Sequence, residues 1–254
     1  MLKELKAGNL KVQVFENRAA MGEAAGKDVT DCIKKLLIEK EEINMIFAAA
    51  PSQDETLAEI VATPGINWGR VNAFHMDEYI GLSADAPQAF GNFLKDRLFS
   101  KLPFKTVNYI YAENESYEET CERYTKLLKE HPIDLVCLGN GENAHIAFND
   151  PWVADFNDKE AIKRVELDNV CRNQQVNDGC FAKIDDVPTH ALTLTVPTLF
   201  NADYIFCTVP APTKAQAVYN TVNAEISEEV PATIMRTHKN AIMYCDPDSG
   251  AKIL

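Results

Sequence analysis

The sequence lacks the features typical of membrane, secreted and nucleic-acid-binding proteins. No apolar run approaches the length needed to cross a bilayer, so we expect no membrane partner. Residues 1–6 contain no apolar segment of the secretory kind, and we expect a cytoplasmic protein. The 25 lysines and arginines are outnumbered by 38 aspartates and glutamates, which gives a net charge of −13. This charge opposes nucleic-acid binding, and any anionic substrate needs a local cationic site.

Paired cysteine motifs are also missing. The 7 cysteines occur singly, without a Cys-x-x-Cys pair, which disfavours a zinc knuckle or thioredoxin-like motif. Several lie in apolar runs, which favours small buried side chains in a reducing compartment. The formal glycosylation sequon that begins at Asn114 is interpreted as chance, since no secretion signal accompanies it.

The chain alternates apolar runs with helical patterns, without a repeat, low-complexity segment or linker. We therefore expect one domain over residues 1–254. Predicted strands cover 12–15, 43–49, 71–76, 107–111, 133–138, 190–196, 203–209 and 241–245, and predicted helices cover 17–40, 53–62, 89–99, 116–129 and 212–222. Strands that are apolar along their whole length predict an α/β fold with a single doubly wound, mostly parallel sheet and helices on both faces. Residues 152–185 are polar and irregular by pattern, and are interpreted as either a flap or a surface excursion.

Two short stretches, residues 74–82 and 138–151, each begin at the end of an apolar strand and change abruptly to polar residues. The carboxyl ends of such strands form the edge at which parallel sheets bind ligands. Asp77 follows the first strand, where a carboxylate can act as a base for a carbon-bound proton; the alternative is a solvated turn. His145 follows the second strand, with Glu142, Asn143 and Asp150 close by in sequence. An imidazole that a carboxamide or carboxylate orients is a plausible proton carrier, and we favour function over structure for it.

The second stretch also matches a Gly-x-Gly-x-x-Ala dinucleotide fingerprint over residues 139–144. That fingerprint requires a helix at its end, whereas Pro151 follows soon after in a turn. Dinucleotide binding is therefore disfavoured. We expect the glycines to allow close backbone approach to some other ligand.

Two strand-to-helix junctions are candidate anion sites. Ser52 and Gln53 begin a helix, whose N-terminus attracts anions; the alternative is a capping box formed by Ser52 and Glu55. Lys214 lies in the first turn of a later helix, where a cation is unfavourable with the helix dipole. That mismatch points to a ligand, although a solvent-facing lysine is an equal alternative.

The residues around Asp77 and His145 resemble motifs of the glucosamine-6-phosphate deaminase/isomerase family. Phe74-His75-Met76-Asp77-Glu78-Tyr79 is similar to its Asp-Glu-Tyr motif. The stretch from His145 to Pro151, His-Ile-Ala-Phe-Asn-Asp-Pro, is similar to its His-Ile-Ala-Phe-Asn-Glu-Pro motif. The resemblance covers nearly the whole chain. Related 6-phosphogluconolactonases lack the second motif, so the chain resembles the amino-sugar branch.

The resemblance implies a modified Rossmann-type domain without a metal or nucleotide cofactor. It implies conversion of a 2-amino-2-deoxyhexose 6-phosphate and water to the ketose 6-phosphate and ammonia, an activity that we class as both isomerase and hydrolase. By the same resemblance Asp77 moves a proton between C2 and C1, and His145 helps to open the sugar ring. The resemblance also implies that Lys214, Ser52 and Gln53 bind the phosphate. The resemblance leaves a homo-oligomer open.

Some positions depart from the family pattern. Asn143 and Ala144 replace an aspartate and a glycine, and Asp150 replaces a longer glutamate. Asn143 can orient the imidazole but cannot hold its charge, which Glu142 or Asp150 then supplies. The phosphate-binding arginine of the family's flap has no clear match, and Arg172 is the nearest candidate. Two alternatives stay open, a sugar-phosphate sensor without activity and an isomerase that does not deaminate.

Overall fold

Eight strands form the main sheet of the computed structural model, which describes residues 1–111 and 115–254. Across the sheet their order is β1 (Lys3–Ala7), β2 (Leu10–Val14), β11 (Ala241–Cys245), β10 (Tyr204–Val209), β7 (Leu135–Leu138), β3 (Ile43–Phe47), β4 (Val71–His75) and β6 (Thr106–Asn108). Only β1 is antiparallel to its neighbour in this sheet. The predicted parallel sheet is confirmed, with β1 as an unpredicted edge strand. Asn114 of the sequon lies outside the described residues.

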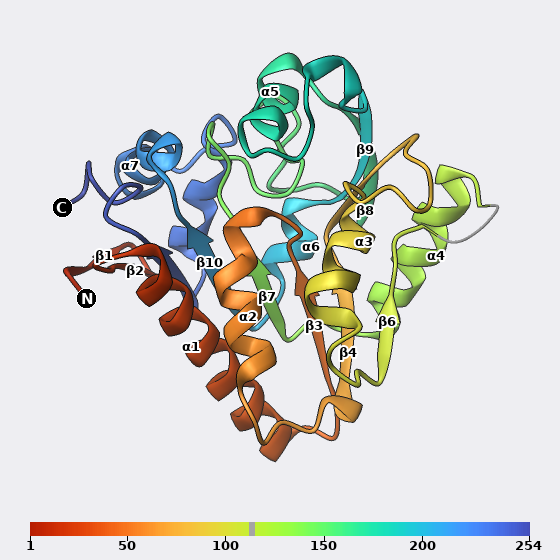
Figure 1. Cartoon of the computed structure of the whole chain (residues 1–254), viewed down its shortest axis with the longest axis horizontal. Helices are drawn as coiled ribbons and strands as arrows, with labels where there is room; N and C mark the ends of the chain where they lie inside the picture. Colours follow the sequence, from red (N-terminus) through yellow and green to blue (C-terminus); the bar gives the residue numbers. More distant parts are fainter. Residues whose placement is uncertain (112–114) are drawn as a thin grey trace.

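Helices cover both faces of this sheet (Figure 1). One face packs against α1 (Arg18–Glu39), α2 (Asp54–Ala62) and α3 (Phe90–Leu94), and the other against α4 (Tyr117–Glu130), α6 (Val196–Phe200) and α7 (Ala215–Asn223). Successive strand residues point to opposite faces, so Met45 and Phe47 enter one apolar core while Ile46 enters the other. Both faces are therefore buried, which explains the continuous apolar strands.

A second sheet lies beside the first and was not predicted. It is antiparallel, with the order β5 (Asp77–Tyr79), β9 (His190–Leu194) and β8 (Ile162–Glu166). The chain passes at Met76 from β4 in the main sheet to β5 in the small one. The prediction of an irregular 152–185 segment is wrong, because this segment contains β8 and α5 (Asn169–Asn177). Short helical turns complete the chain: η1 (Pro51–Gln53), η2 (Trp68–Arg70), η3 (Lys95–Phe99), η4 (Ile184–Asp186), η5 (Pro212–Lys214) and η6 (Pro231–Thr237).

The order of the parallel strands reverses between β3 and β7. From β3 the chain adds β4 and β6 on one side, and then returns to add β7 and β10 on the other. Ligands of open α/β sheets bind at such a reversal, outside the carboxyl ends of the strands. In Figure 1 helix α5 lies above these ends. No helix in the described part of the chain is long and apolar enough to cross a bilayer.

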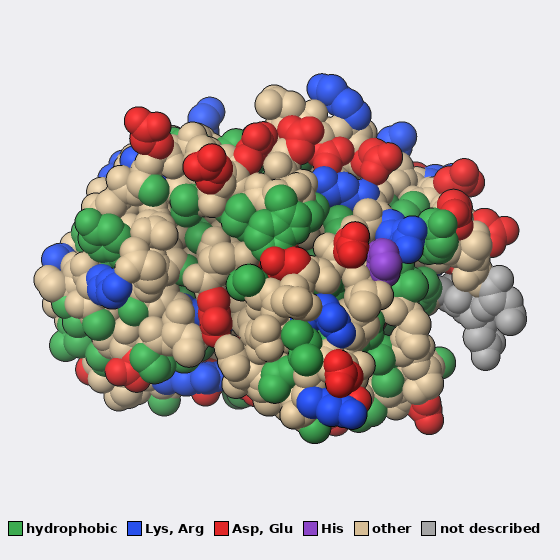
Figure 2. All heavy atoms as spheres, turned by 90° about the horizontal axis from the view of Figure 1, so that it is seen from above, with side chains coloured by type: hydrophobic (Ala, Val, Ile, Leu, Met, Phe, Trp, Pro, Cys, Tyr) green, Lys and Arg blue, Asp and Glu red, His purple; other side chains and the backbone are tan. Residues whose placement is uncertain are grey.

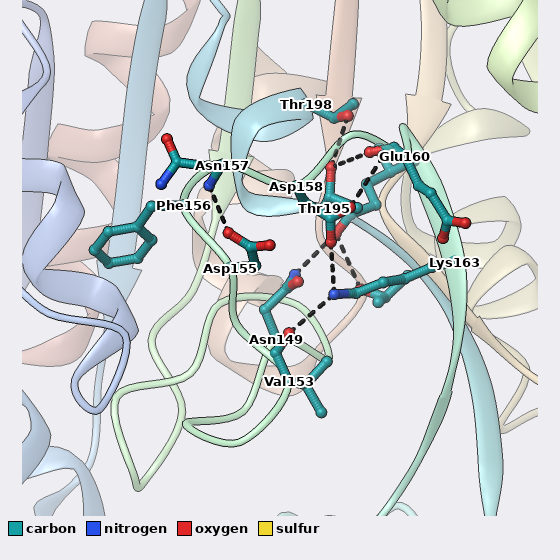
Figure 3. Close-up of polar contacts among 12 residues, drawn as sticks. Asn149, Val153, Asp155, Phe156, Asn157, Asp158, Glu160, Lys163, Thr195 and Thr198 are labelled. Carbon is teal, nitrogen blue, oxygen red and sulfur yellow. Dashed lines mark hydrogen bonds and ion pairs between the residues drawn. The ribbon is translucent and has the colours of Figure 1, made fainter.

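Side-chain contacts fix the segment that leads from the end of β7 to β8 (Figure 3). The buried Asn149 amide donates to the carbonyls of Ile146 and Leu194. Lys163 of β8 donates to the Val153 carbonyl at 2.9 Å and to the Asp158 carboxylate at 2.7 Å. These contacts tie the segment to the small sheet, and so fix the chain on both sides of Asp150.

Candidate active site

A cavity of about 330 Å³ opens at the carboxyl ends of β3, β4, β7 and β10. Its volume lies at the lower end of the range for small-molecule sites. Asp77 and His145 both line it, so the two strand ends singled out in the sequence meet at one cavity. The other polar lining residues are Arg18, Ser52, Asn140, Gln174, Gln175, Asn177, Asp178, Thr213 and Lys214.

The His145 imidazole is held from one side, leaving the other for the cavity. Its Nδ1 lies 2.7 Å from the Asn143 carboxamide oxygen and 3.2 Å from an Asp150 carboxylate oxygen. The Asn143 amide nitrogen in turn donates to Asp150 at 2.8 Å, which fixes the carboxamide orientation. Both neighbours of Nδ1 are acceptors, so Nδ1 carries a proton. In the neutral ring Nε2 is then the free base.

Asp150 is the carboxylate beside the imidazole. It is almost fully buried at 1% exposure. Burial raises the pKa of Asp150, but the charge of His145 and the hydrogen bonds from His145, Asn143 and Cys171 outweigh it and leave this pKa below its usual value. Glu142 makes no hydrogen bond or ion pair to the imidazole within the described residues. Of the two carboxylates expected to balance the charge of the imidazole, Asp150 is therefore the one beside it, and Glu142 is not.

The backbone around His145 is shaped by its ring. A Cβ added to Gly141 would lie 2.1 Å from the imidazole, so only glycine fits below it. Gly141 also lines the cavity, where a ligand is expected to approach the backbone, and it leaves room for this ring as well. Ala144 and Ala147 adopt φ values of 65° and 51°, in the left-handed region that alanine rarely occupies. Ala211, before Lys214, has a φ of 86°. Together these three are the left-handed non-glycine residues of the described chain.

Asp77 and Glu78 are neighbours in sequence with different surroundings. Burial, and then the charge of Glu78, raise the pKa of Asp77 well above its usual value. The Asp77 carboxylate lines the cavity. Glu78 points away from the cavity and accepts hydrogen bonds from the backbone N–H groups of Tyr79, Phe90 and Gly91 at the start of α3. Glu78 therefore fixes a helix, and Asp77 is the carboxylate available to a ligand.

Lys214, in η5 after β10, and Ser52, in η1 after β3, both line the cavity. Lys214 is 5% exposed and lies 3.9 Å from the Asp178 carboxylate. Burial lowers the pKa of Lys214, while Asp178 and Glu142 oppose this shift. A buried ammonium that faces a cavity is a strong anion ligand. The solvent-facing alternative for Lys214 is therefore wrong.

Gln53 does not line the cavity, and the alternative interpretation of Ser52 and Glu55 as a capping box is wrong, because no side chain caps η1 or α2 within the described residues. Gln53 is buried, and its amide donates to the Leu138 carbonyl at 3.3 Å and to Ser52 Oγ at 3.2 Å. It therefore ties the start of α2 to the end of β7 behind Ser52. Glu55, the expected partner of Ser52, instead pairs with Arg18 at 2.7 Å.

The arginine at the cavity is Arg18 rather than Arg172. The Arg172 guanidinium donates to the carbonyls of Ile184 and Val187, and it does not line the cavity. Arg18 opens α1 at the cavity wall. A sequence signal existed for it, since a cation in the first turn of a helix opposes the dipole, as it does at Lys214.

Helix α5 supplies two further residues that sequence reasoning did not assign. Gln174 and Gln175 are each 7% exposed and line the cavity. Gln174 accepts a hydrogen bond from the Glu142 backbone at 2.9 Å, which ties α5 to the end of β7. Residues 1–111 and 115–254 contain no cluster of three or more histidine, cysteine or acidic side chains with metal-site geometry.

Comparison with known sequences matches this chain to a family over most of its length. The family described as glucosamine-6-phosphate isomerases/6-phosphogluconolactonase matches residues 16–244. A protein of Listeria innocua serovar 6a named glucosamine-6-phosphate deaminase is 32% identical over 228 residues, which are 90% of this chain and 95% of that protein. A protein of the same name from Streptococcus pneumoniae strain 70585 is 30% identical over 240 residues, 94% of this chain and 97% of its own length.

Solved structures of similar proteins share the fold. The structure of a monomeric glucosamine-6-phosphate deaminase, 26% identical, covers 95% of this chain and 99% of its own with a TM-score of 0.83. A 6-phosphogluconolactonase from Thermotoga maritima, 20% identical, covers 92% and 98% with a TM-score of 0.73, a likeness of fold alone. The class of hydrolase expected above is wrong, because the matched relatives are named deaminases and the family is described by its isomerases.

Proposed function

Because the chain belongs to the family of glucosamine-6-phosphate isomerases and 6-phosphogluconolactonases, we propose that it converts a hexosamine 6-phosphate to the ketose 6-phosphate and ammonia. The observation that carries this proposal is the meeting of Asp77, His145 and Lys214 at one cavity. A partner-free carboxylate, an oriented imidazole and a buried cation are the groups that this reaction requires of a protein.

The reaction begins with ring opening at His145. The free Nε2 of the imidazole takes the proton of the C1 hydroxyl and returns a proton to the ring oxygen as the C1–O5 bond breaks. The developing charge on the ring is stabilised by Asp150, whose carboxylate lies 3.2 Å from Nδ1. Asn143 holds the ring plane by its 2.7 Å contact. The product of this step is the open-chain amino aldehyde.

Asp77 then moves the proton that distinguishes aldose from ketose. Its carboxylate removes the C2 proton while water protonates the aldehyde oxygen, which gives an enolamine. The resulting carboxylic acid then returns the proton to C1 as the nitrogen releases a proton to water, which gives a ketimine. Water adds at C2, ammonia leaves, and the ketose 6-phosphate remains, so atoms balance. The raised pKa of Asp77, caused by burial and by Glu78, makes its carboxylate a stronger base for a carbon acid.

The phosphate of the substrate is assigned to the side of the cavity formed by Lys214, Ser52 and Arg18. Lys214 and Arg18 supply the local positive charge that a chain of net charge −13 needs in order to bind an anionic substrate. Replacing Lys214 by methionine is expected to raise KM by about 10- to 100-fold, because a charge-assisted contact is lost. Arg18→Met should raise KM by about tenfold. Arg172→Met, outside the cavity, is the matched control and should leave KM unchanged.

The decisive test is ammonia release from glucosamine 6-phosphate and galactosamine 6-phosphate, assayed side by side. Release from either supports the proposal, and the ratio of kcat/KM values gives the preferred hexosamine. Tight binding of both sugars without turnover would instead indicate a sensor. Conversion of glucose 6-phosphate to a ketose, with no ammonia from either amino sugar, would indicate an isomerase that does not deaminate.

We propose two further properties, a single domain and a cytoplasmic location. The cavity draws on residues from Arg18 to Lys214, which favours one catalytic domain over residues 1–254. The cysteines are all unpaired, which favours a cytoplasmic location. Figure 2 shows acidic and basic side chains mixed over the face seen from above, without one large apolar area there. A sedimentation experiment decides between a monomer, as described for the 26% identical relative, and a homo-oligomer.

A further inference from the structure

We propose that His75 is a positioning residue for Asp77, whose main chain it holds through the imidazole ring. The inference rests on the proposed function, in which Asp77 is the base. His75 is the last residue of β4, is 1% exposed and does not line the substrate cavity. It acts through Asp77 rather than on the substrate.

The hydrogen bonds of His75 fix the position of its ring proton. The backbone N–H of Ile110 points at Nε2, with 2.9 Å between the nitrogens. A donor there requires a lone pair on Nε2, so the proton of the neutral ring lies on Nδ1. Nδ1 lies 3.0 Å from the carbonyl oxygen of Asp77, to which it donates. Burial lowers the pKa of His75 to about 4, so this neutral form persists at neutral pH.

The Asp77 carbonyl needs such a donor because the small sheet does not supply one. Across β5 and β9, the Leu194 N–H donates to the Met76 carbonyl and the Ile80 N–H donates to the His190 carbonyl. In an antiparallel ladder, bonded and non-bonded pairs alternate. The pair Asp77 and Thr193 therefore falls between bonded positions, and the Asp77 carbonyl points away from β9. His75 satisfies a buried acceptor that would otherwise be left without a partner.

A second side chain holds the backbone of His75 itself. The Tyr124 hydroxyl of α4 accepts from the His75 N–H at 3.1 Å and lies 2.9 Å from the His75 carbonyl and 3.1 Å from the Asn108 carbonyl. The crossing from β4 to β5 is thus fixed at His75 by Tyr124 and at Asp77 by the imidazole. The Asp77 carboxylate has no hydrogen bond to any described side chain or backbone group, so its place depends on this main chain.

Two substitutions separate the two hydrogen bonds of the ring. Asparagine at position 75 places an amide near Nδ1 and can donate to the Asp77 carbonyl, but it cannot reach Ile110. Glutamine places its amide oxygen near Nε2 and can accept from Ile110, but it leaves the Asp77 carbonyl without a donor. We expect His75→Gln to lower kcat by about 10²-fold with little change in KM, since small displacements of a base are costly. His75→Asn should keep kcat within about threefold of the wild type.

The thermal midpoint is measured for both variants, because each loses one buried hydrogen bond and similar stability is expected. A purely structural role would lower stability without separating the kcat values of the pair. Equal kcat in both variants, or a larger loss for asparagine than for glutamine, would overturn the proposal.

Chemical rescue covers the case in which glutamine prevents folding. His75 lines a second cavity of about 760 Å³, which shares no lining residue with the cavity at Asp77. Imidazole added to His75→Gly has access to this vacated space, and should recover at least a tenth of wild-type kcat. No recovery in a folded variant counts against the proposal.

A readout without turnover distinguishes this inference from the proposed function. In a ¹⁵N spectrum of the wild type, His75 should stay protonated at Nδ1 and free at Nε2 from about pH 6 to about pH 9. A proton on Nε2 would overturn the positioning role even in an active enzyme. Failure of the wild type to release ammonia, with the Nδ1 proton present, would reject the activity and leave the hydrogen-bond assignment standing.

Discussion

At the carboxyl end of β4, the imidazole ring of His75 bonds to two backbone groups, while Asp77 lines the cavity and its carboxylate has no hydrogen-bond partner among the described residues. At the carboxyl end of β7, Asp150 is bound by its neighbours while the ring of His145 faces the cavity. Each strand end thus carries one histidine and one aspartate. At the end of β4 the aspartate faces the cavity, and at the end of β7 the histidine does. The partner that each side chain is given, rather than its chemical type, assigns its role.

The largest test of this comparison is Asp77→Asn. We expect ammonia release to fall by about 10³- to 10⁴-fold, because an amide cannot take a proton from carbon. Sugar-phosphate binding should remain measurable, since the phosphate side of the cavity is untouched. The matched control is Glu78→Gln, in which the adjacent carboxylate that caps α3 is changed. This control should lose stability and keep most of its turnover, because burial, the larger cause of the raised pKa of Asp77, is unchanged. An Asp77→Asn variant that keeps its activity would remove Asp77 from the chemistry.

The end of β7 is tested by a double-mutant cycle. His145→Gln should lower kcat by about 10²-fold, because ring opening loses its proton carrier. Asp150→Asn alone should lower kcat by about tenfold, since it removes the charge beside the imidazole. Because Asp150 is assigned to act through His145, adding Asp150→Asn to His145→Gln should change kcat by less than about threefold.

Additive effects in this cycle would show that Asp150 acts on the substrate independently of the ring. Asp158→Asn is the control carboxylate. It pairs with Lys163 outside the cavity, and its loss should alter stability without altering kcat (Figure 3).

The buried ring of His75 at the end of β4 predicts that the folded protein loses stability at acidic pH. His75 has a pKa of about 4 in the folded protein because of burial, against 6.5 for the free side chain. The unfolded chain therefore takes up a proton before the folded protein does, and stability is lost as pH falls from 6.5 toward 4. This loss is about 3 kcal/mol for the ring alone.

His75→Asn removes the titrating ring and keeps the other acidic and basic groups. The free energy of unfolding of the wild type, relative to this variant, should fall by about 3 kcal/mol between neutral pH and pH 4. Denaturant unfolding at both pH values measures it. A constant difference between the two proteins would mean that the ring is not held neutral by the fold.

The end of β7 was more predictable from sequence than the end of β4. His145, Asn143 and Asp150 lie within one short loop, so their contact follows from chain proximity. The role of His75 depends on Ile110 and Tyr124, which reach it only when β4, β6 and α4 are assembled. Such non-local contacts leave no pattern in the sequence near His75.

The identity of the arginine at the cavity was also not predictable from the sequence. Arg172 belongs to the short polar helix α5, which has no apolar stripe to indicate which side faces inward. In the structure Gln174 and Gln175 face the cavity, and Arg172 contacts η4. The apolar pattern of α1, in contrast, predicted a helix over 17–40, and Arg18–Glu39 is observed. Long apolar periodicity fixes an element, whereas the phase of a short polar helix depends on its neighbours.

The smallest expected effect concerns backbone strain, which the end of β7 carries and that of β4 does not. Ala144 has a φ of 65° and a buried methyl group. Glycine at this position relieves about 1–2 kcal/mol of left-handed strain but costs about 0.5–1 kcal/mol of chain entropy, so Ala144→Gly should change stability by less than about 1 kcal/mol. Ala217→Gly, at an equally buried position within α7, relieves no strain and should cost at least about 1 kcal/mol. Denaturant midpoints of the two variants compare them directly. Equal losses of stability in Ala144→Gly and Ala217→Gly would mean that the backbone at Ala144 is unstrained. In that case, strain in this left-handed turn would not be what holds the His145 imidazole against Gly141.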